Sequence, residues 1–405
     1  MKISFTSGIF VLTQRVTLGL IGVVIWLELI PAGICRGAEL AWSGSLESSE
    51  TYRSFRDPAT SPPETFFDNN LNLKLDINGS EKVSGRVLLQ YYTNPPSWLQ
   101  VGTAGSQSVF INQAYIDYSL TQDSLLRVGR QKISWGSGMA WNPTNYIGAD
   151  KNRADLTTGF PGVDAIDYQF NRGDFSATLA LKPMESWEQW GRALKVQWAI
   201  PHCDLAFSLF QEGSANAFGT DVAATVGEYT VYSELALRTG SQFYVSGSGE
   251  TPALQTRSVD RHYLHGVLGM NRIFADNLMM QLEYYYNEEG WGIPEEKAYF
   301  NYVAEYPGER AALSAQKANL FGELGRNYLY LLIRKTGILE DLSLTGNCLW
   351  NIEDHSYQLT PVLEYQLTQE AVTVLMVNFS NGDEASEFGS ELSQYQILAK
   401  LVLNF

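Results

Sequence analysis

The sequence has few residues of the types that form covalent frameworks or metal sites. Its 405 residues include three cysteines and four histidines. Cys203 and Cys348 are far apart in the sequence, and Cys35 falls in a segment that we expect to be removed. Two distant thiols form neither a disulfide framework nor a cysteine-based metal site. No C-x-x-C-H haem attachment sequence occurs. We therefore expect no cofactor and no bound metal.

Charge is scarce as well, and basic charge most of all. Only 18% of residues are charged, against roughly a quarter in soluble proteins. The 28 Lys and Arg residues face 44 Asp and Glu residues, which gives a net charge of −16. This balance argues against nucleic-acid binding, which needs clustered basic residues. No nucleotide loop, redox motif or assembled catalytic set appears, so we expect no enzyme.

Apolar and aromatic residues are plentiful, at 45% and 13% of the chain. That is too much apolar surface for a disordered protein, so a folded body is expected. A surface so poor in charge needs an apolar medium or a partner to cover it.

The first 37 residues have the pattern of a signal peptide. Lys2 and Arg15 precede an apolar run from Leu18 to Ile30, and small residues follow. We expect cleavage after Gly37 or Ala38, leaving residues 38–405 as one domain. The alternative is an uncleaved anchor helix, although the run is shorter than the ~20 apolar residues of a spanning helix.

The rest of the chain alternates between apolar and polar residues with a period of two. The last segment is the clearest example: six residues from Tyr395 to Phe405 share one face, and Gln396, Lys400 and Asn404 lie on the other. A soluble β-sandwich would also alternate, but its strands average about 5–6 residues. Segments of about 10 residues, with an apolar face that often ends in Tyr or Trp, suit tilted strands that cross a bilayer.

We therefore predict an all-β, antiparallel, up-and-down transmembrane β-barrel of about 18 strands (16–18). Short turns mostly alternate with longer connections, which places both termini in the periplasm. The expected strands are 41–52, 69–79, 82–92, 109–120, 123–133, 163–171, 174–182, 192–199, 203–211, 226–238, 241–249, 260–273, 277–288, 327–336, 341–350, 355–366, 370–380 and 393–405.

Four residues fit this pattern poorly or need a special account. Pro361 lies inside a strand, where we expect a bulge. Arg130 and Lys132 share the lipid-facing register of Val128. Either they lie at the outer membrane–water interface, or a bulge at Gly129 turns their side chains inward. We favour the bulge. Cys348 falls in the apolar register, so we expect a packed free thiol.

The leader, the alternation and the terminal strand ending in Phe405 resemble outer-membrane β-barrel proteins of Gram-negative bacteria, whose last strand is read by the barrel-assembly machinery. The segments from Arg127 to Gly136 and from Trp141 to Thr144 are similar to a Gly-Arg-Gln then Trp-Gly stretch of several porin-like and exporter-like barrels. The class resemblance covers the whole mature chain. The local motif covers under thirty residues and does not separate one barrel family from another.

If the apolar register faces lipid, the other register lines the lumen. The expected lining is balanced in charge, with Asp76, Asp117, Glu228, Glu234, Glu283 and Glu364 against Lys74, Arg86, Lys182, Lys195, Arg334 and Lys400. Eighteen strands enclose a lumen too wide for side chains to fill, so this lining fits an aqueous channel. A lumen plugged by loops is the alternative.

The connection from Trp135 to Gly162 is the strongest candidate for a functional element, because a long loop in a compact protein is usually functional or disordered. We expect it to fold inward and constrict the channel, with Asp150, Lys151, Arg153 and Asp155 setting up a transverse field. The alternative is an outward surface loop.

The connections 289–326 and 381–392 carry much of the acidic charge. They could bind divalent cations shared with lipopolysaccharide or concentrate cations at the mouth; simple solvation of exposed loops is an equally good account. Within the first, residues 310–324 predict a short helix above or inside the pore.

We expect a passive channel for small hydrophilic solutes or ions in the outer membrane, with lipid, lipopolysaccharide and the assembly machinery as partners and homo-oligomers as an option. Alternatives are a sheath around a multihaem cytochrome in an electron conduit, a polymer exporter and, with His265 as a base, a lipid hydrolase. The charge balance of the lumen weighs against a polyanion exporter.

Overall fold

The computed structural model describes residues 38–56, 62–94, 108–149, 151, 159–184, 186–240, 243–246, 253–256, 258, 260–305, 324–391 and 393–405. The expected signal peptide lies outside these residues, as does the predicted helix 310–324 apart from Leu324. Within the described ranges, no helix is both long and apolar enough to cross a membrane.

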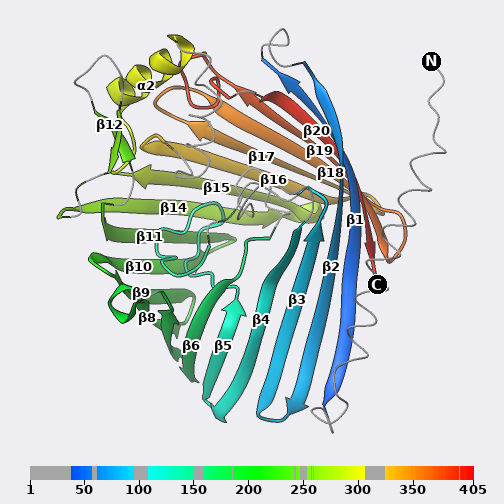
Figure 1. Cartoon of the computed structure of the whole chain (residues 1–405), viewed down its shortest axis with the longest axis vertical. Coiled ribbons are helices and arrows are strands. Elements are labelled where there is room, and N and C mark those ends of the chain that lie inside the picture. Colours follow the sequence, from blue (N-terminus) through cyan, green and yellow to red (C-terminus); the bar gives the residue numbers. More distant parts are fainter. Residues whose placement is uncertain are drawn as a thin grey trace.

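Eighteen antiparallel strands form a closed barrel (Figure 1). Each strand pairs with the next along the chain, and the last pairs back with the first. The strands are β1 (Glu39–Phe55), β2 (Glu64–Ser80), β3 (Val83–Tyr92), β4 (Ser108–Thr121), β5 (Ser124–Gln131), β6 (Val163–Arg172), β7 (Phe175–Lys182), β8 (Gly191–Ile200), β9 (Cys203–Glu212), β10 (Ala215–Val226), β11 (Tyr229–Thr239), β14 (His262–Phe274), β15 (Leu278–Asn287), β16 (Asn327–Leu339), β17 (Leu342–Asn351), β18 (Tyr357–Gln366), β19 (Ala371–Asn381) and β20 (Ser393–Asn404). The predicted fold class and strand number are therefore confirmed.

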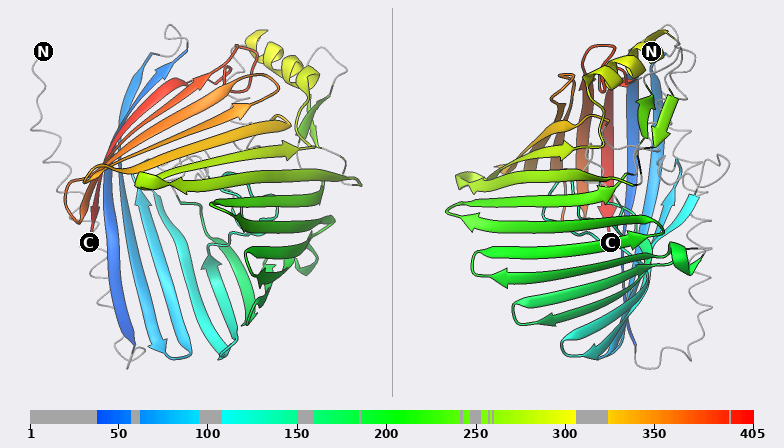
Figure 2. Two further views of the ribbon diagram at one scale, coloured as in Figure 1. Left: turned by 180° about the vertical axis from the view of Figure 1, so that it is seen from behind. Right: turned by 90° about the vertical axis from the view of Figure 1, so that its left-hand side faces the viewer.

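The two ends of the barrel differ in the length of their connections. Tight turns such as Glu81-Lys82 and Pro201-His202 join strands at one end, and the first strand starts and the last strand ends there. The long connections lie at the other end, where α2 (Ile293–Glu305) and a separate hairpin of β12 (Phe243–Ser246) and β13 (Ala253–Thr256) are found (Figures 1 and 2). This is the asymmetry expected of an outer-membrane barrel.

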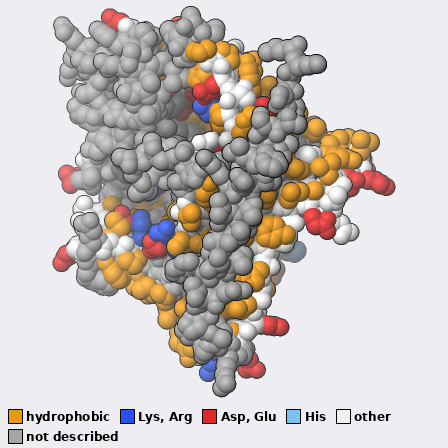
Figure 3. Space-filling model, turned by 45° about the vertical axis from the view of Figure 1, so that its right-hand side comes forward, with side chains coloured by type: hydrophobic (Ala, Val, Ile, Leu, Met, Phe, Trp, Pro, Cys, Tyr) orange, Lys and Arg blue, Asp and Glu red, His pale blue; other side chains and the backbone are white. Residues whose placement is uncertain are grey.

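The outer face of the barrel is apolar. On β9, Phe207 and Leu209 are 47% and 49% exposed, whereas Ala206 and Ser208 on the opposite face are each 4% exposed. Figure 3 shows hydrophobic side chains spread over the outside of the strands. A folded protein with so large an exposed apolar surface requires lipid around it.

One strand of the predicted set is wrong. Of the segment 241–249, the structure describes Phe243–Ser246, which pairs with Ala253–Thr256 in a separate hairpin and with no barrel strand among the described residues. The missing strand is β10 (Ala215–Val226), which pairs with β9 and β11. The total stayed at eighteen because one false strand replaced one missed strand.

Pro361 causes no bulge. Leu359 lies opposite Phe379 and Val362 opposite Met376, so the register is the same on both sides of the proline. The β18–β19 ladder only skips two residues there, while Pro361 still pairs with Gly346 of β17. A strand residue directs its N–H to one neighbour only, so a proline weakens one ladder and spares the other.

The expected bulge at Gly129 is also absent. Val128, Gly129 and Arg130 pair in continuous register with β4, and Arg130 stays on the outer side, where it forms an ion pair with Asp164 at 2.6 Å. Arg130 therefore lies near the end of β5 with its side chain on the outside of the barrel, as in the other of the two expectations. The bulge lies on β4 instead, where Asn112 is the extra residue.

Candidate functional site in the barrel lumen

The connection that follows β5 lies inside the barrel. Residues 132–149, here called the inner loop, run within the ring of strands in Figures 1 and 2, and they contact the inward side chains of β10, β11 and β15. The prediction that this connection folds inward agrees with these contacts.

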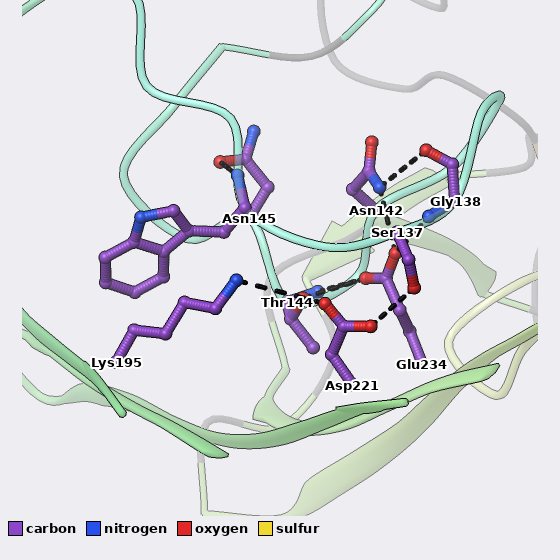
Figure 4. A network of polar contacts seen from close by, with 9 residues as sticks. Ser137, Gly138, Asn142, Thr144, Asn145, Lys195, Asp221 and Glu234 are labelled. Carbon is purple, nitrogen blue, oxygen red and sulfur yellow. Dashed lines mark hydrogen bonds and ion pairs between the residues drawn. The ribbon is translucent and has the colours of Figure 1, made fainter. Parts of the chain in front are cut away.

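Glu234 of β11 is the first anchor of the inner loop (Figure 4). Its Oε1 accepts the Gly138 N–H at 2.7 Å and the Asn142 side-chain amide at 2.9 Å. Its Oε2 accepts the Thr144 hydroxyl at 2.8 Å. Glu234 is fully buried, and a buried carboxylate is tolerated because several donors surround it.

Glu283 of β15 is the second anchor. Its carboxylate accepts the backbone N–H groups of Met139 and Ala140, the latter at 2.8 Å. The Tyr232 hydroxyl of β11 donates to it at 2.7 Å. Glu283 is likewise fully buried. Two wall carboxylates therefore bind consecutive N–H groups of one loop segment.

A third contact joins the loop to a charged pair of the wall. The Ser137 hydroxyl donates to Asp221 Oδ1 at 2.5 Å, and Lys195 Nζ lies 3.9 Å from Asp221 Oδ2 (Figure 4). Asp221 lies on β10 and Lys195 on β8. The predicted lining residue Lys195 thus neutralises the wall beneath the loop.

Aromatic packing fixes the loop on its other side. Trp141 is 1% exposed and stacks on Tyr285 of β15, with ring centroids 4.9 Å apart. It also packs against Tyr328 and Tyr330 of β16. This part of the inner wall therefore has an apolar core rather than a water layer.

Small side chains on the wall make room for the loop. Ile133, Trp135, Tyr146 and Ile147 pack on a set of almost fully buried inward alanines from five strands, namely Ala165, Ala180, Ala193, Ala217 and Ala236. At Gly219 of β10, an added Cβ would lie 2.4 Å from the Tyr146 hydroxyl. The wall from β6 to β11 is thus shaped to receive the inner loop.

Of the four predicted constriction residues, only Lys151 is among the described residues. Its ammonium donates to the carbonyls of Gly138 and Met139, at 2.8 and 3.2 Å. Lys151 therefore braces the inner loop. Asp150, Arg153 and Asp155 lie outside the described residues.

The predicted lining residues lie on the inner face of the strands, with the exception of Glu228. That residue lies in the turn before β11, which begins at Tyr229, and its side chain is 72% exposed and paired with Arg272. The prediction of Glu228 as a wall residue is wrong because β11 starts at Tyr229, one residue after Glu228.

Most charges of the lining are paired with a neighbour on the wall. The pairs with their N–O distances are Lys74–Asp76 (3.2 Å), Arg86–Asp76 (2.6 Å), Arg127–Asp117 (2.6 Å), Lys182–Glu212 (3.6 Å), Arg334–Glu364 (3.6 Å) and Lys400–Glu47 (3.6 Å). Such pairing keeps the field of the wall small.

The inner faces of β1, β2 and β3, here called the open wall, keep access to water. Lys74 and Arg86 side chains are 38% and 37% exposed, in contrast to the fully buried anchors. A cavity of about 650 Å³ extends this surface, lined by residues that include Ser84, Arg86, Asp117 and Arg127. The lumen therefore has a covered side and an open side.

Sequence reasoning missed the anchoring role of Glu234 and Glu283 and did not identify Asp221 at all. Many of the donors to the two glutamates are backbone N–H groups 90 or more residues away, which leave no side-chain pattern in the sequence. The available signal was the set of inward alanines, which are unusual on a water-facing wall.

The sequence matches no protein-family model and no curated protein. Solved structures are similar in fold. OccK11 (OpdR) of Pseudomonas aeruginosa is 10% identical with a TM-score of 0.56, and the match covers 90% of this chain and 96% of that one. OccAB1 of Acinetobacter baumannii is 8% identical with a TM-score of 0.57 and the same coverage. The outer membrane protein OpdK of Pseudomonas aeruginosa is 9% identical with a TM-score of 0.55, over 91% and 98%. The chain therefore has the fold of an 18-stranded outer-membrane porin barrel.

Proposed function

We propose that this protein is a passive diffusion channel for small hydrophilic solutes in the outer membrane of a Gram-negative bacterium, and that the inner loop constricts it. The observation that carries the proposal is the division of the lumen. Glu234 and Glu283 hold the inner loop on one side, and the open wall faces water on the other. The similar fold of outer-membrane barrels supports the location.

The constriction follows from the size of the barrel. Eighteen strands alone leave a wide aqueous lumen. The inner loop fills the covered side with packed side chains, so a solute must pass along the open wall. Because most wall charges are paired, size and hydrogen bonding should select solutes more strongly than the sign of charge.

The other candidate functions have no specific support. A hydrolase needs a nucleophile in hydrogen-bond reach of its base. His265 is 2% exposed and contacts Glu289 at 2.9 Å and Tyr285 at 3.2 Å, and no serine among the described residues contacts its ring. A cytochrome sheath needs an empty lumen, whereas the inner loop fills part of this one.

The proposal is tested by planar-bilayer recording with refolded residues 38–405. We expect an open, ohmic pore with a small reversal potential in a salt gradient. A variant that lacks residues 136–148 should conduct at least severalfold more, because the barrel width would then set the conductance. A folded but silent barrel would refute the channel. An unchanged conductance in the deletion variant would refute the constriction.

A further inference from the structure

A row of side-chain amides crosses the open wall. Asn72 on β2, Gln90 on β3 and Asn112 on β4, here called the amide row, bond to one another on the inner face. Asn112 Nδ2 donates to Gln90 Oε1 at 2.7 Å, and Gln90 Nε2 donates to Asn72 Oδ1 at 2.8 Å. Three neighbouring strands thus carry amides at one level of the barrel.

Both ends of the row are fixed by other groups. The Gly162 N–H, just before β6, donates to Asn112 Oδ1 at 2.8 Å. At the other end, Asn72 Nδ2 donates to Glu47 Oε1 at 3.1 Å, and Lys400 of β20 lies 3.6 Å from Glu47 Oε2. The N–H groups that link the row all point the same way, from Asn112 toward Glu47, so these bonds polarise one another.

The row retains unused hydrogen-bonding capacity. A primary amide has two donor hydrogens and an oxygen with two lone pairs. Gln90 uses one of each, and Asn72 uses both hydrogens, on Glu47 and on Ser45 Oγ at 3.0 Å. Gln90 therefore keeps one donor and one acceptor position, and Asn72 keeps one acceptor position. Both side chains are only half-buried, whereas Asn112 is covered.

Each charge beside the row already has a partner, although Lys74 and Arg86 share one carboxylate, which leaves an excess of one positive charge. Lys400 is paired with Glu47, and Lys74 and Arg86 are both paired with Asp76. A charged solute would have to shed water, and an anion would have to compete with Asp76 for Lys74 and Arg86. A neutral solute with hydroxyl groups can use the free amide positions without that cost.

We propose that the amide row is a binding strip for neutral, hydroxyl-rich solutes such as sugars and polyols. The proposal rests on the channel function proposed above and names its substrate class. Hydroxyl groups both donate and accept, as the free positions of Gln90 and Asn72 require. Adjacent strands are about 4.8 Å apart, so amides at one level on neighbouring strands can bind two hydroxyls of one sugar.

The test is the block of ion current by glucose, measured in a planar bilayer with the wild type and with an Asn72→Leu, Gln90→Met double variant. Both substitutions keep the size of the side chain and remove its polar atoms. The control is Gln197→Met, the same change on the inner face of β8 outside the row. In the wild type, glucose should reduce the current in a saturable manner.

The double variant should need about tenfold more glucose for half block, as expected for the loss of two hydrogen bonds. Glucose block of the Gln197→Met control should stay as in the wild type. Equal glucose block in the double variant and the wild type would overturn the proposal. So would a saturable block of the wild type by acetate or by guanidinium that is stronger than the block by glucose.

The failures of the two proposals are distinguishable. A pore that conducts ions but shows no saturable glucose block overturns the amide row proposal and leaves the channel intact. A folded barrel without conductance overturns both. Heat-dependent gel mobility and far-UV circular dichroism establish that each variant is folded, and a single Gln90→Met variant replaces the double variant if the latter fails to fold.

Discussion

Buried carboxylates hold the inner loop because they act only as acceptors. Glu234 and Glu283 each meet several donors from the loop and the wall. A glutamine in either position would turn an N–H toward loop N–H groups and repel them. Hydrogen bonds to a charged group contribute about 1.5–3 kcal/mol each, so one such substitution is enough to release the loop segment locally.

The first prediction concerns Glu234→Gln. The inner loop should detach in part, so single-channel recordings should show a higher mean conductance and more frequent fluctuations. The matched control is Glu364→Gln, because Glu364 also faces the lumen but pairs with Arg334 on the wall. Identical current noise in both variants would show that Glu234 does not position the loop.

The sequence could place Glu234 and Glu283 on the inner face, since period-two alternation assigns a face to every strand residue. It could not reveal that they anchor a loop. Their donors are backbone N–H groups, which every residue but proline has, and uncharged amide and hydroxyl groups, so no basic residue marks the contact. The alternation alone therefore predicts water-facing lining at both positions.

At the scale of strands, the barrel closes where β1 meets β20. Gly44 and Phe405 exchange backbone hydrogen bonds at 2.8 and 3.0 Å. A Cβ on Gly44 would lie 2.5 Å from the Asn72 carbonyl oxygen and 2.7 Å from the Phe405 ring. The absence of a side chain at Gly44 therefore leaves room for the Phe405 ring and the β2 backbone at this point.

The second prediction follows from this contact. Gly44→Val should destabilise the barrel by about 1–3 kcal/mol, the usual cost of overpacking, measured as a lower urea midpoint in detergent micelles. Gly346→Val on β17 is the control, because an added Cβ there meets nothing within 4 Å. An equal loss in both variants would point to a general effect of valine instead of strain at the seam.

The helix α2 has its own buried acid. Glu296 is 1% exposed, and burial beside Glu387, Asp354 and Glu353 raises its pKa to about 9. Asn351 donates to both Glu296 and Glu387, each at 3.1 Å. The folded protein thus holds a proton on Glu296 that the unfolded chain would release near pH 4.5.

The third prediction is a pH dependence with a defined sign. Because Glu296 has a higher pKa in the folded protein than in the unfolded chain, binding of its proton stabilises the fold. This contribution is complete below about pH 4.5 and is lost as the pH rises toward about 9. The wild type should therefore lose thermal stability relative to Glu296→Gln between pH 6 and 9.5, because the amide cannot ionise. The measurement is the apparent Tm of both proteins across that range. Parallel curves would contradict the prediction.

Strand prediction failed at β10, within the part of the wall that lies beneath the inner loop. On β10 the inward positions are Ala217, Gly219, Asp221 and Ala223, and outward Ala224 is also small. These small residues accommodate the inner loop, and they erase the contrast between the two faces. Phe243–Ser246 alternates well enough to be taken for a wall strand, although it pairs only with β13. The same packing that builds the site therefore hid one strand from the sequence pattern.

At the scale of the whole molecule, the lumen is eccentric. Inward residues of β6 to β11 lie under the inner loop, and the aromatic residues of β15 and β16 pack against Trp141. The inward residues of β2 and β3 are half-buried or exposed. In the proposed channel, a path along the axis of the barrel would meet the loop, so we expect solutes to pass beside the open wall and through the cavity at Ser84 and Arg86.

The fourth prediction maps this path with single cysteines in a background without native thiols (Cys203→Ser, Cys348→Ser). Ser84→Cys should react with a membrane-impermeant methanethiosulfonate reagent and lower the current, because Ser84 lines the open cavity. Ala236→Cys should stay unreactive, because Ala236 is 0% exposed beneath the inner loop. Leu235→Cys on the lipid face controls for access through the membrane.

A combined Ala236→Cys, Glu234→Gln variant should become reactive at position 236, since the loop that covers this position has lost an anchor. Rapid modification of Ala236→Cys in a protein that keeps Glu234 would mean that solutes reach both sides of the lumen, and the eccentric path would then be wrong.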